Sequence, residues 1–146
     1  MGDENIMMLE AELVLELTVE LGETQEVGQT PKGFLRLIPI TGGEFSGPNI
    51  KGKILLGGYD WNTVVNEDIT HVFAKYAIQT EDGVNISVEN EGYLNAKQQD
   101  ALIITSPKFQ VQEGKYDWLN SGVFVGSLQG GITEKPSVRI KIYKMK

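Results

Sequence analysis

The sequence predicts an all-β protein, a closed up-and-down antiparallel β-barrel of the lipocalin or calycin type with about eight to ten strands. Three observations predict it. Apolar and polar residues alternate along many segments, short turn-forming stretches separate these segments, and no segment of ten or more residues has the 3.6-residue period of a helix. A chain of 146 residues is expected to form one domain, 1–146, of which residues 1–6 are a disordered tail.

The two ends of the chain alternate most regularly and carry opposite charges. Residues 13–21 place leucine or valine at every second position, and residues 137–144 do the same with valine and isoleucine. Residues 1–29 contain eight acids and no base, whereas residues 135–146 contain five bases and no acid. Opposite charges that face each other across two strands contribute about 0.2–1 kcal/mol per pair. We therefore expect the first and last strands to pair and close the barrel; the alternative is that each is a separately solvated face.

The middle of the chain is a succession of short strands and turns. Glu81-Asp82-Gly83 is a strong hairpin signal, because Asp-Gly supplies the positive φ angles of a tight turn. The glycine-rich stretches 41–48 and 57–62 and the pair 91–92 are expected to interrupt or connect strands, and residues 93–99 to form one helical turn. Strands are expected at 33–40, 50–56, 70–80, 84–90, 101–105, 109–112, 122–128 and 137–144.

Strand length and connection length together favour a barrel over a sandwich. Several strands of eight to eleven residues are too long for a small immunoglobulin-like sandwich, and every connection is short. A barrel of about eight strands leaves an interior that holds one small ligand. Glycines at 42, 43, 47, 52, 57 and 58 suit the bulges and bends that closure needs.

Composition narrows the partners and the chemistry. The net charge of −7, from 13 basic and 20 acidic residues, opposes binding to nucleic acid or to an anionic membrane. There is no cysteine, so disulfides and thiol chemistry are excluded. His71 is the single histidine and is expected at the surface, and no metal site or cofactor is expected. The start of the chain has no signal-peptide pattern, which predicts a cytoplasmic protein.

Several strings of residues resemble a known family. They are Pro31-Lys32-Gly33, the stretch 36–48 (RLIPITGGEFSGP), the stretch 52–61 (GKILLGGYDW), the stretch 75–83 (KYAIQTEDG), Asn90-Glu91-Gly92, Pro107-Lys108-Phe109, and 116–126 with YDWLN at its start. In this order they are similar to the uncharacterised bacterial family called domain of unknown function 3237, over about residues 10–143. The resemblance implies a calycin-like β-barrel and little about function. The family usually has arginine where this chain has Lys75, and lysine binds a carboxylate more loosely.

Two short segments combine an aromatic ring with polar side chains and are candidate ligand contacts. Asp60-Trp61-Asn62 follows two glycines, so a carboxylate, an indole and an amide are expected to converge at the barrel mouth. The alternative is a turn in which Asp60 caps its own backbone and Trp61 plugs the end of the barrel. Trp118 and Asn120 repeat the combination of aromatic ring and amide. Apolar walls with a few polar groups are typical of small-molecule pockets.

Three charged residues are further candidates for contacts inside the barrel: Arg36, Glu44 and Lys75. Lys75 lies on the face of its strand opposite to Tyr76. If that face points inward, Lys75 must pair with an acid, Asp60 or Glu44, or with an anionic ligand, because an isolated buried charge is costly. The alternative is that Lys75 lies on a solvated face. Arg36 has the same two interpretations.

The first of two possible functions is binding. In this interpretation the barrel encloses a small, partly apolar and anionic metabolite, for which Trp61 and Trp118 form walls. Arg36, Lys75 and Asn120 then supply polar contacts. A homodimer is a possible way to cover an apolar outer face of the middle strands, and a barrel filled with side chains would instead indicate a structural protein.

The second possible function is catalysis without a cofactor, by an isomerase, cyclase or lyase. Asp60 is then the general base, and Lys75 or Arg36 stabilises a developing oxyanion. A carboxylate works well as a base when burial raises its pKa toward neutrality. Whether Asp60 lies desolvated in a cavity or faces water therefore distinguishes the two functions.

Overall fold

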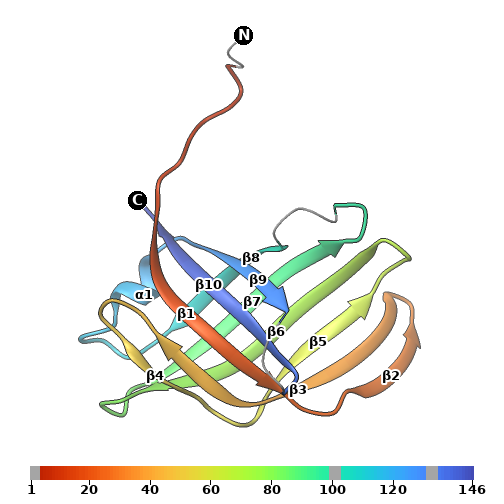
Figure 1. Ribbon diagram of the computed structural model, residues 1–146, viewed down its shortest axis with the longest axis horizontal. Coiled ribbons are helices and arrows are strands. Elements are labelled where there is room, and N and C mark those ends of the chain that lie inside the picture. The colour runs from red at the N-terminus through yellow and green to blue at the C-terminus, as the bar shows by residue number, and fades with distance from the viewer. Residues whose placement is uncertain (1–3, 99–102, 131–134) are drawn as a thin grey trace.

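The structure is a computed structural model that describes residues 4–98, 103–130 and 135–146. Its described residues form ten strands and one short helix, arranged as a barrel (Figure 1). The elements are β1 (Ala11–Leu21), β2 (Gln25–Thr30), β3 (Gly33–Ser46), β4 (Lys51–Ile54), β5 (Gly58–Val64), β6 (Ile69–Thr80), β7 (Asn85–Asn95), β8 (Ile103–Gln110), α1 (Trp118–Ser121), β9 (Phe124–Gly130) and β10 (Ser137–Met145).

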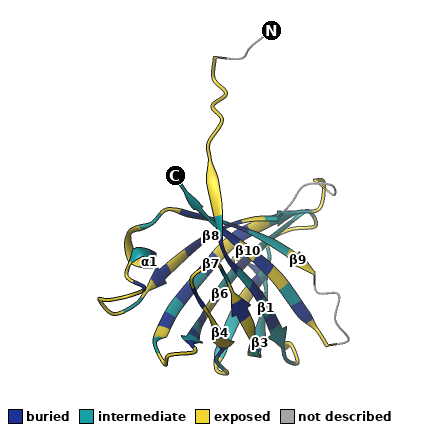
Figure 2. Ribbon diagram, turned by 60° about the vertical axis from the view of Figure 1, so that its left-hand side comes forward, coloured by how far each residue is buried: buried dark blue, intermediate teal, exposed yellow. Residues whose placement is uncertain are grey.

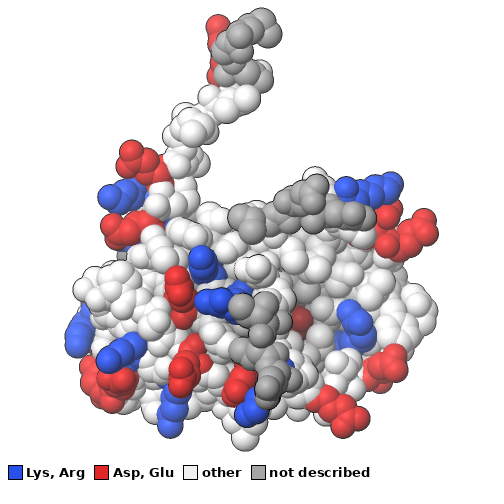
Figure 3. All heavy atoms as spheres, viewed as in Figure 1, with Lys and Arg blue, Asp and Glu red and all other residues white. Residues whose placement is uncertain are grey.

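The first and last strands close the barrel, as their opposite charges predict. β1 pairs antiparallel with β10, and the register places Glu12 opposite Lys144 and Glu16 opposite Lys141. The other side of β1 pairs with β3. Every other neighbour in the barrel is also antiparallel, so the predicted all-β closed barrel is confirmed. Red and blue side chains are accordingly interspersed over the face that β1 and β10 present (Figure 3).

Ten strands occupy only eight positions around the barrel, because two positions are each filled by two consecutive strands. β4 and β5 lie one after the other between β3 and β6. β1 and β2 likewise both pair with β3. β1 pairs with the second half of β3, and β2 pairs with the first half of β3. The long strand β3 therefore has two consecutive partners on each of its sides.

Buried residues alternate with more exposed ones along most strands, and the buried ones form the core of the barrel (Figure 2). Bands of buried and exposed residues follow one another along the strands in that figure. The largest fully buried side chains are Leu15, Leu17, Val19, Ile40, Ile78, Ile86, Val88, Leu119 and Ile142.

The short helix α1 closes one end of the barrel. Leu119 of this helix is fully buried in the core, and the Trp118 ring packs beside Phe124, with ring centroids 6.4 Å apart. The segment before the helix is hydrogen-bonded to the β6–β7 turn: the Tyr116 hydroxyl donates to the Asp82 carboxylate over 2.8 Å. A hydrogen bond from the Thr80 hydroxyl, together with this one from Tyr116, holds the pKa of Asp82 below its ordinary value.

Two of the predicted turns are strand instead, because their glycines permit close approach of backbones and not reversal. β3 continues through the stretch predicted as a turn at 41–48 as far as Ser46, and a Cβ at Gly43 would lie 1.9 Å from the Thr18 carbonyl oxygen. β7 continues through Gly92 to Asn95, which corrects both the turn at 91–92 and the helical turn at 93–99. A Cβ at Gly92 would lie 2.8 Å from the Ile104 carbonyl oxygen. Residue 99 lies outside the described residues.

Three further differences concern element boundaries. The stretch 57–62, expected to interrupt the chain between strands, supplies most of β5, so Asp60-Trp61-Asn62 is part of a strand and not a turn. The two strands expected at 101–105 and 109–112 are one strand, β8, although residues 101–102 lie outside the described residues. β9 pairs with β8 only as far as Thr105, so the missing N–H of Pro107 removes no bond to β9. The sequence did not predict α1 or β2.

The predicted hairpin turn is confirmed, and the N-terminal segment lies apart from the barrel. Gly83 has a φ of 90°, and its amide donates to the Thr80 carbonyl between β6 and β7. Residues 4–10 precede β1 and project away from the barrel (Figure 1), and residues 1–3 of the predicted tail 1–6 lie outside the described residues. The described part of the chain contains no helix with the length and apolar character needed to cross a membrane.

Candidate functional site

The half of the barrel opposite α1 contains an interior cavity of about 230 Å³. Side chains from the inward faces of nearly all strands line it. Its apolar lining consists of Val19, Leu21, Ile38, Ile40, Val72, Ala74, Leu94, Leu128, Val138 and Ile140. Its polar lining consists of Arg36, Asp60, Asn62, Thr70, Tyr76, Asn90 and Thr105.

A hydrogen-bonded chain of Arg36, Asn62 and Asp60, which we call the charged cluster, occupies the β3–β5 side of the cavity. The buried Asn62 side chain accepts hydrogen bonds at Oδ1 from Nε of Arg36, over 3.1 Å, and from Nη2 of Arg36. Its Nδ2 donates to Asp60 Oδ2 over 3.4 Å, and the Phe73 backbone amide donates to Asp60 Oδ1 over 3.0 Å. The amide thus holds a guanidinium on one side and a carboxyl group on the other.

Asp60 has the environment of an acid–base group. Burial raises the pKa of its carboxyl group above the ordinary value, although the hydrogen bonds from Phe73 and Asn62 and the charge of Arg36 act in the opposite direction. Carboxyl groups with such a shift are frequent in functional sites. Asp60 points into the cavity, so it is within reach of a bound molecule.

Stability should depend on pH through Asp60. Because the folded protein holds this proton more tightly than the unfolded chain, unfolding free energy falls as pH rises through the raised pKa. The Asp60→Asn variant has no titrating group at this position, so its unfolding free energy does not fall for this reason. Wild type should therefore gain stability relative to Asp60→Asn as pH is lowered from 7, and the difference should stop changing below about pH 3.9, the ordinary pKa of aspartate.

Urea unfolding at a series of pH values measures this difference, with Glu23→Gln, an exposed carboxylate outside the cavity, as the control for loss of one negative charge. A constant offset between wild type and Asp60→Asn from pH 7 to pH 4 would contradict the prediction.

A second polar group, which we call the neutral cluster, lies on the β6–β8 side of the cavity. It consists of Tyr76, Asn90 and Thr105, which are 5%, 3% and 4% exposed. The Tyr76 hydroxyl, Asn90 Oδ1 and Thr105 Oγ1 have no hydrogen-bond partner among the described residues. Burial raises the pKa of the Tyr76 phenol well above its usual range, so the hydroxyl keeps its proton.

A single small residue, Ala74, lies between the two clusters. Ala74 of β6 is the register partner of Asp60 on one side and of Asn90 on the other. The two polar side chains therefore point into the same space from strands two positions apart, with only a methyl group between them. This arrangement leaves room for a molecule that contacts both clusters.

Of the candidate residues, the structure places Arg36 and Asp60 in the cavity and leaves Trp61 and Lys75 on the outside of the barrel. Arg36 and Asp60 point inward. Because successive residues of a strand point to opposite faces, Trp61 points outward, is 41% exposed and packs against Tyr59. It therefore neither converges with Asp60 nor plugs the barrel end. The Lys75 side chain is also outside, 60% exposed, and pairs with Glu89 over 3.3 Å, which is the solvated-face alternative.

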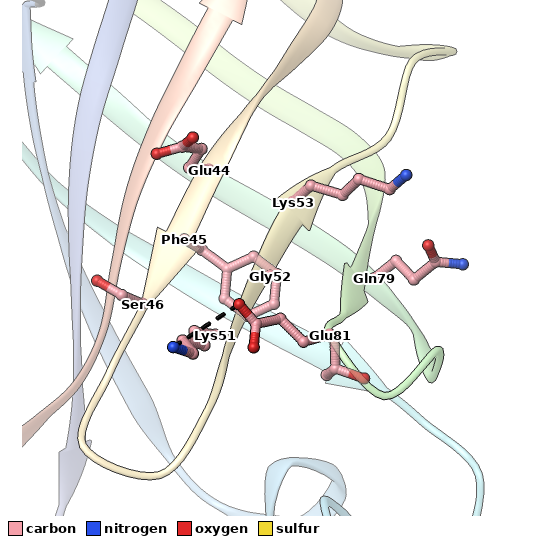
Figure 4. A pocket seen from close by; sticks show the side chains of 9 residues that line it. Glu44, Phe45, Ser46, Lys51, Gly52, Lys53, Gln79 and Glu81 are labelled. Atoms are coloured by element: carbon pink, nitrogen blue, oxygen red, sulfur yellow. Dashed lines mark ion pairs between the residues drawn. The ribbon is translucent and has the colours of Figure 1, made fainter.

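Three more candidates lie far from the cavity. Trp118 and Asn120 belong to α1 at the other end of the barrel, where the Asn120 side chain bonds the backbone amide and carbonyl of Val111. Glu44 is exposed on the outer face of β3 (Figure 4), beside an open hollow where Lys51 and Glu81 pair over 3.7 Å. His71 is on the outer face too, bonded to Glu91.

Sequence reasoning missed the neutral cluster and the linking role of Asn62. Tyr76 shares a strand face with Val72 and Ala74, and alternation alone leaves open whether that face is the interior one. Asn90 and Thr105 occupy inward positions in alternating strands, and a buried amide or hydroxyl in such a position is the signal that could have found them. No three metal-ligating side chains gather in the described part of the chain.

Comparison with known proteins gives one family. The family model "Protein of unknown function (DUF3237)" matches residues 9–145. The chain is 32% identical over 133 residues to the UPF0311 protein RPA1785 of Rhodopseudomonas palustris, covering 82% of this chain and 87% of that one. The crystal structure of RPA1785 superposes with a TM-score of 0.86, at 28% identity, over 97% of this chain and all of that one. A β-barrel like protein from Acinetobacter baumannii gives 0.84, at 29% identity, over 99% and 100%.

One fungal relative has a named activity. The hydroalkoxylation enzyme phnH of Penicillium herquei is 33% identical over 82 residues, which is 56% of this chain and 49% of that one. The crystal structure of an enzyme from Penicillium herquei has the same fold, with a TM-score of 0.76 at 23% identity over the full length of both chains.

Proposed function

The chain belongs to the DUF3237 family of proteins of unknown function, and on this premise we propose that its barrel binds a small, partly apolar organic anion in the interior cavity. The observation that carries the proposal is that the Arg36 guanidinium lines the cavity with part of its hydrogen-bonding capacity unused. Two of its five N–H groups bond Asn62, which leaves three that have no partner among the described residues, and none of the ion pairs found there includes Arg36. A cation in a mostly apolar cavity inside the barrel is the complement of an anion with an apolar body.

The size of the cavity limits the ligand to about one ring. A cavity of roughly 150 Å³ accommodates benzene. The 230 Å³ available here therefore holds one six-membered ring with a few substituents. The apolar lining contacts the ring, and Arg36 of the charged cluster contacts the acidic substituent.

Binding of simple carboxylates tests the proposal. Benzoate and cyclohexanecarboxylate should raise the Tm of the wild-type protein, and titration calorimetry should show about 10- to 100-fold weaker binding to Arg36→Met, since a hydrogen bond to a charged group contributes roughly 1.5–3 kcal/mol. Lys75→Met is the matched control, because it removes a cation outside the barrel and should leave binding unchanged. The proposal is wrong if neither carboxylate raises the Tm, or if Arg36→Met binds as tightly as wild type.

A second candidate function is cofactor-independent catalysis by Asp60, favoured by its raised pKa and by its position in the interior cavity. The named activity of the Penicillium relative suggests the reaction type. Hydroalkoxylation adds an O–H group across a carbon–carbon double bond, so an O–C bond and a C–H bond form while the O–H and π bonds break. One carboxyl group gives a proton to carbon and takes one from oxygen, and no redox partner is needed.

A phenol with an ortho alkenyl side chain contains both reacting groups in one molecule of suitable size. Wild type should convert it to a cyclic ether of equal mass, detected by chromatography, and Asp60→Asn should abolish turnover while still binding benzoate. Conversion by Asp60→Asn at the wild-type rate, or none by wild type, would count against this candidate.

Other expectations from the sequence stay predictions. They are a cytoplasmic location, the absence of nucleic-acid and membrane partners, and a homodimer that covers the outer face of the middle strands. That outer face carries Tyr59, Trp61 and Phe73 on adjacent strands.

A further inference from the structure

We propose that the ligand is a hydroxy acid, whose acidic group binds Arg36 and whose hydroxyl group, on the far side of its apolar body, binds the neutral cluster of Tyr76, Asn90 and Thr105. The inference rests on the proposed function and extends it to the ligand's second polar group. It is drawn from the side of the cavity opposite to Arg36.

The neutral cluster lacks partners that its burial requires. Its three side chains are all more than nine-tenths buried, and each has a polar atom without a hydrogen bond in the described structure. A buried polar atom left unpaired costs about 1–3 kcal/mol, so natural proteins rarely keep one without a reason. Here three such atoms, from three adjacent strands, line one cavity.

The chemistry of the three atoms matches a hydroxyl group. The Tyr76 hydroxyl keeps its proton and donates, Asn90 Oδ1 only accepts, and Thr105 Oγ1 does either. A ligand hydroxyl donates once and accepts twice, which matches the donors and acceptors that the neutral cluster leaves unpaired. A carboxylate would leave Asn90 Oδ1 unpaired, and an ammonium would leave the Tyr76 proton unpaired.

The spacing of the strands sets where the two polar groups of the ligand lie. Asp60 of the charged cluster and Asn90 of the neutral cluster are both register partners of Ala74, so their strands are two positions apart, about 10 Å between backbones. Arg36 lies on β3, one strand beyond Asp60, and its side chain reaches back to Asn62 of β5. The body of the ligand lies over Ala74, between the clusters. A ring that carries its two polar groups on opposite sides fits this arrangement.

Paired ligands test the inference. Affinities of benzoate, 3-hydroxybenzoate and 4-hydroxybenzoate are measured by calorimetry for wild type, Tyr76→Phe and Thr105→Val. Wild type should bind one of the hydroxybenzoates about tenfold more tightly than benzoate. Each variant should reduce that preference at least threefold and leave benzoate affinity within twofold of wild type. Tyr93→Phe removes an exposed hydroxyl from the outer face and should keep the full preference.

The outcomes separate this inference from the proposed function. If benzoate binds in an Arg36-dependent way but neither hydroxybenzoate is preferred, or the preference survives in both variants, the hydroxyl site is wrong and the proposed function stands. If no carboxylate binds, the proposed function fails and the inference with it. Both variants remove an unpaired buried atom, so without ligand their Tm should equal or exceed that of wild type. A Tm lower by several degrees would show that the hydroxyl has a partner within the protein, and would overturn the inference.

Discussion

Replacing Asn62 with alanine is expected to lower the free energy of unfolding by about 2–4 kcal/mol. The buried amide makes hydrogen bonds to two charged groups, the Arg36 guanidinium and the Asp60 carboxyl group. Each bond to a charged group contributes roughly 1.5–3 kcal/mol, and its loss leaves a desolvated charge without a partner. Alanine supplies neither the acceptor nor the donor, so both groups lose their link at once.

Urea unfolding monitored by tryptophan fluorescence measures this loss. Asn85→Ala is the matched control, since Asn85 is an exposed amide that accepts one hydrogen bond from Gln79. Its change should stay below about 0.5 kcal/mol. Equal stability of Asn62→Ala and wild type would mean that the amide does not hold the charged cluster together. The same variant should weaken benzoate binding, because Arg36 loses the contacts that orient it.

Replacing Leu119 with alanine is expected to lower the free energy of unfolding by about 2–5 kcal/mol, the usual range for a leucine truncated in a core. Leu119 is the one buried residue of α1 and packs in the main core cluster. A helix of four residues is not stable by itself, so its place at the barrel end depends on this side chain. Truncation should therefore loosen the closed end as well as create a cavity.

Thermal and urea unfolding test this prediction, with Val123→Ala as the control. Val123 follows the helix closely in sequence but is exposed, so its truncation should change stability by less than about 0.5 kcal/mol. Benzoate affinity should be nearly unchanged in Leu119→Ala, because the cavity lies in the other half of the barrel. A loss of stability no larger than that of Val123→Ala would show that α1 does not seal the barrel.

The closure of the barrel was predictable because it depends on alternation and charge, which are local properties. Glu12 and Glu16 face Lys144 and Lys141 as expected. The glycine-rich stretches were misinterpreted for a physical reason. Glycine permits both chain reversal and close backbone approach, and only the neighbouring strand decides which occurs. At Gly43 and Gly92 the neighbour is a backbone carbonyl within 3 Å of where a Cβ would lie.

The candidate site was predicted in part, because the alternation of side chains along a strand is a local property too. Alternation places Asp60 and Asn62 on one face and Trp61 on the other, once the segment is known to be a strand. The two glycines before this segment left two interpretations open, convergence of the three side chains at the barrel mouth or a turn capped by Asp60, and neither of them is a regular strand. The pairing of β5 with β3 and β6 settled this, and also brought Arg36 beside Asn62.

The sequence by itself determined the fold class, the pairing of the first and last strands, and which residues of most strands share a face, because each follows from a period of two and from charge. Only the tertiary structure decided which face is interior, which end α1 closes, and which polar residues meet. Those properties depend on the register between strands distant in sequence. Asp60, Ala74 and Asn90 lie in one row only because β5, β6 and β7 pair as they do, and this row spans the space between the charged and neutral clusters.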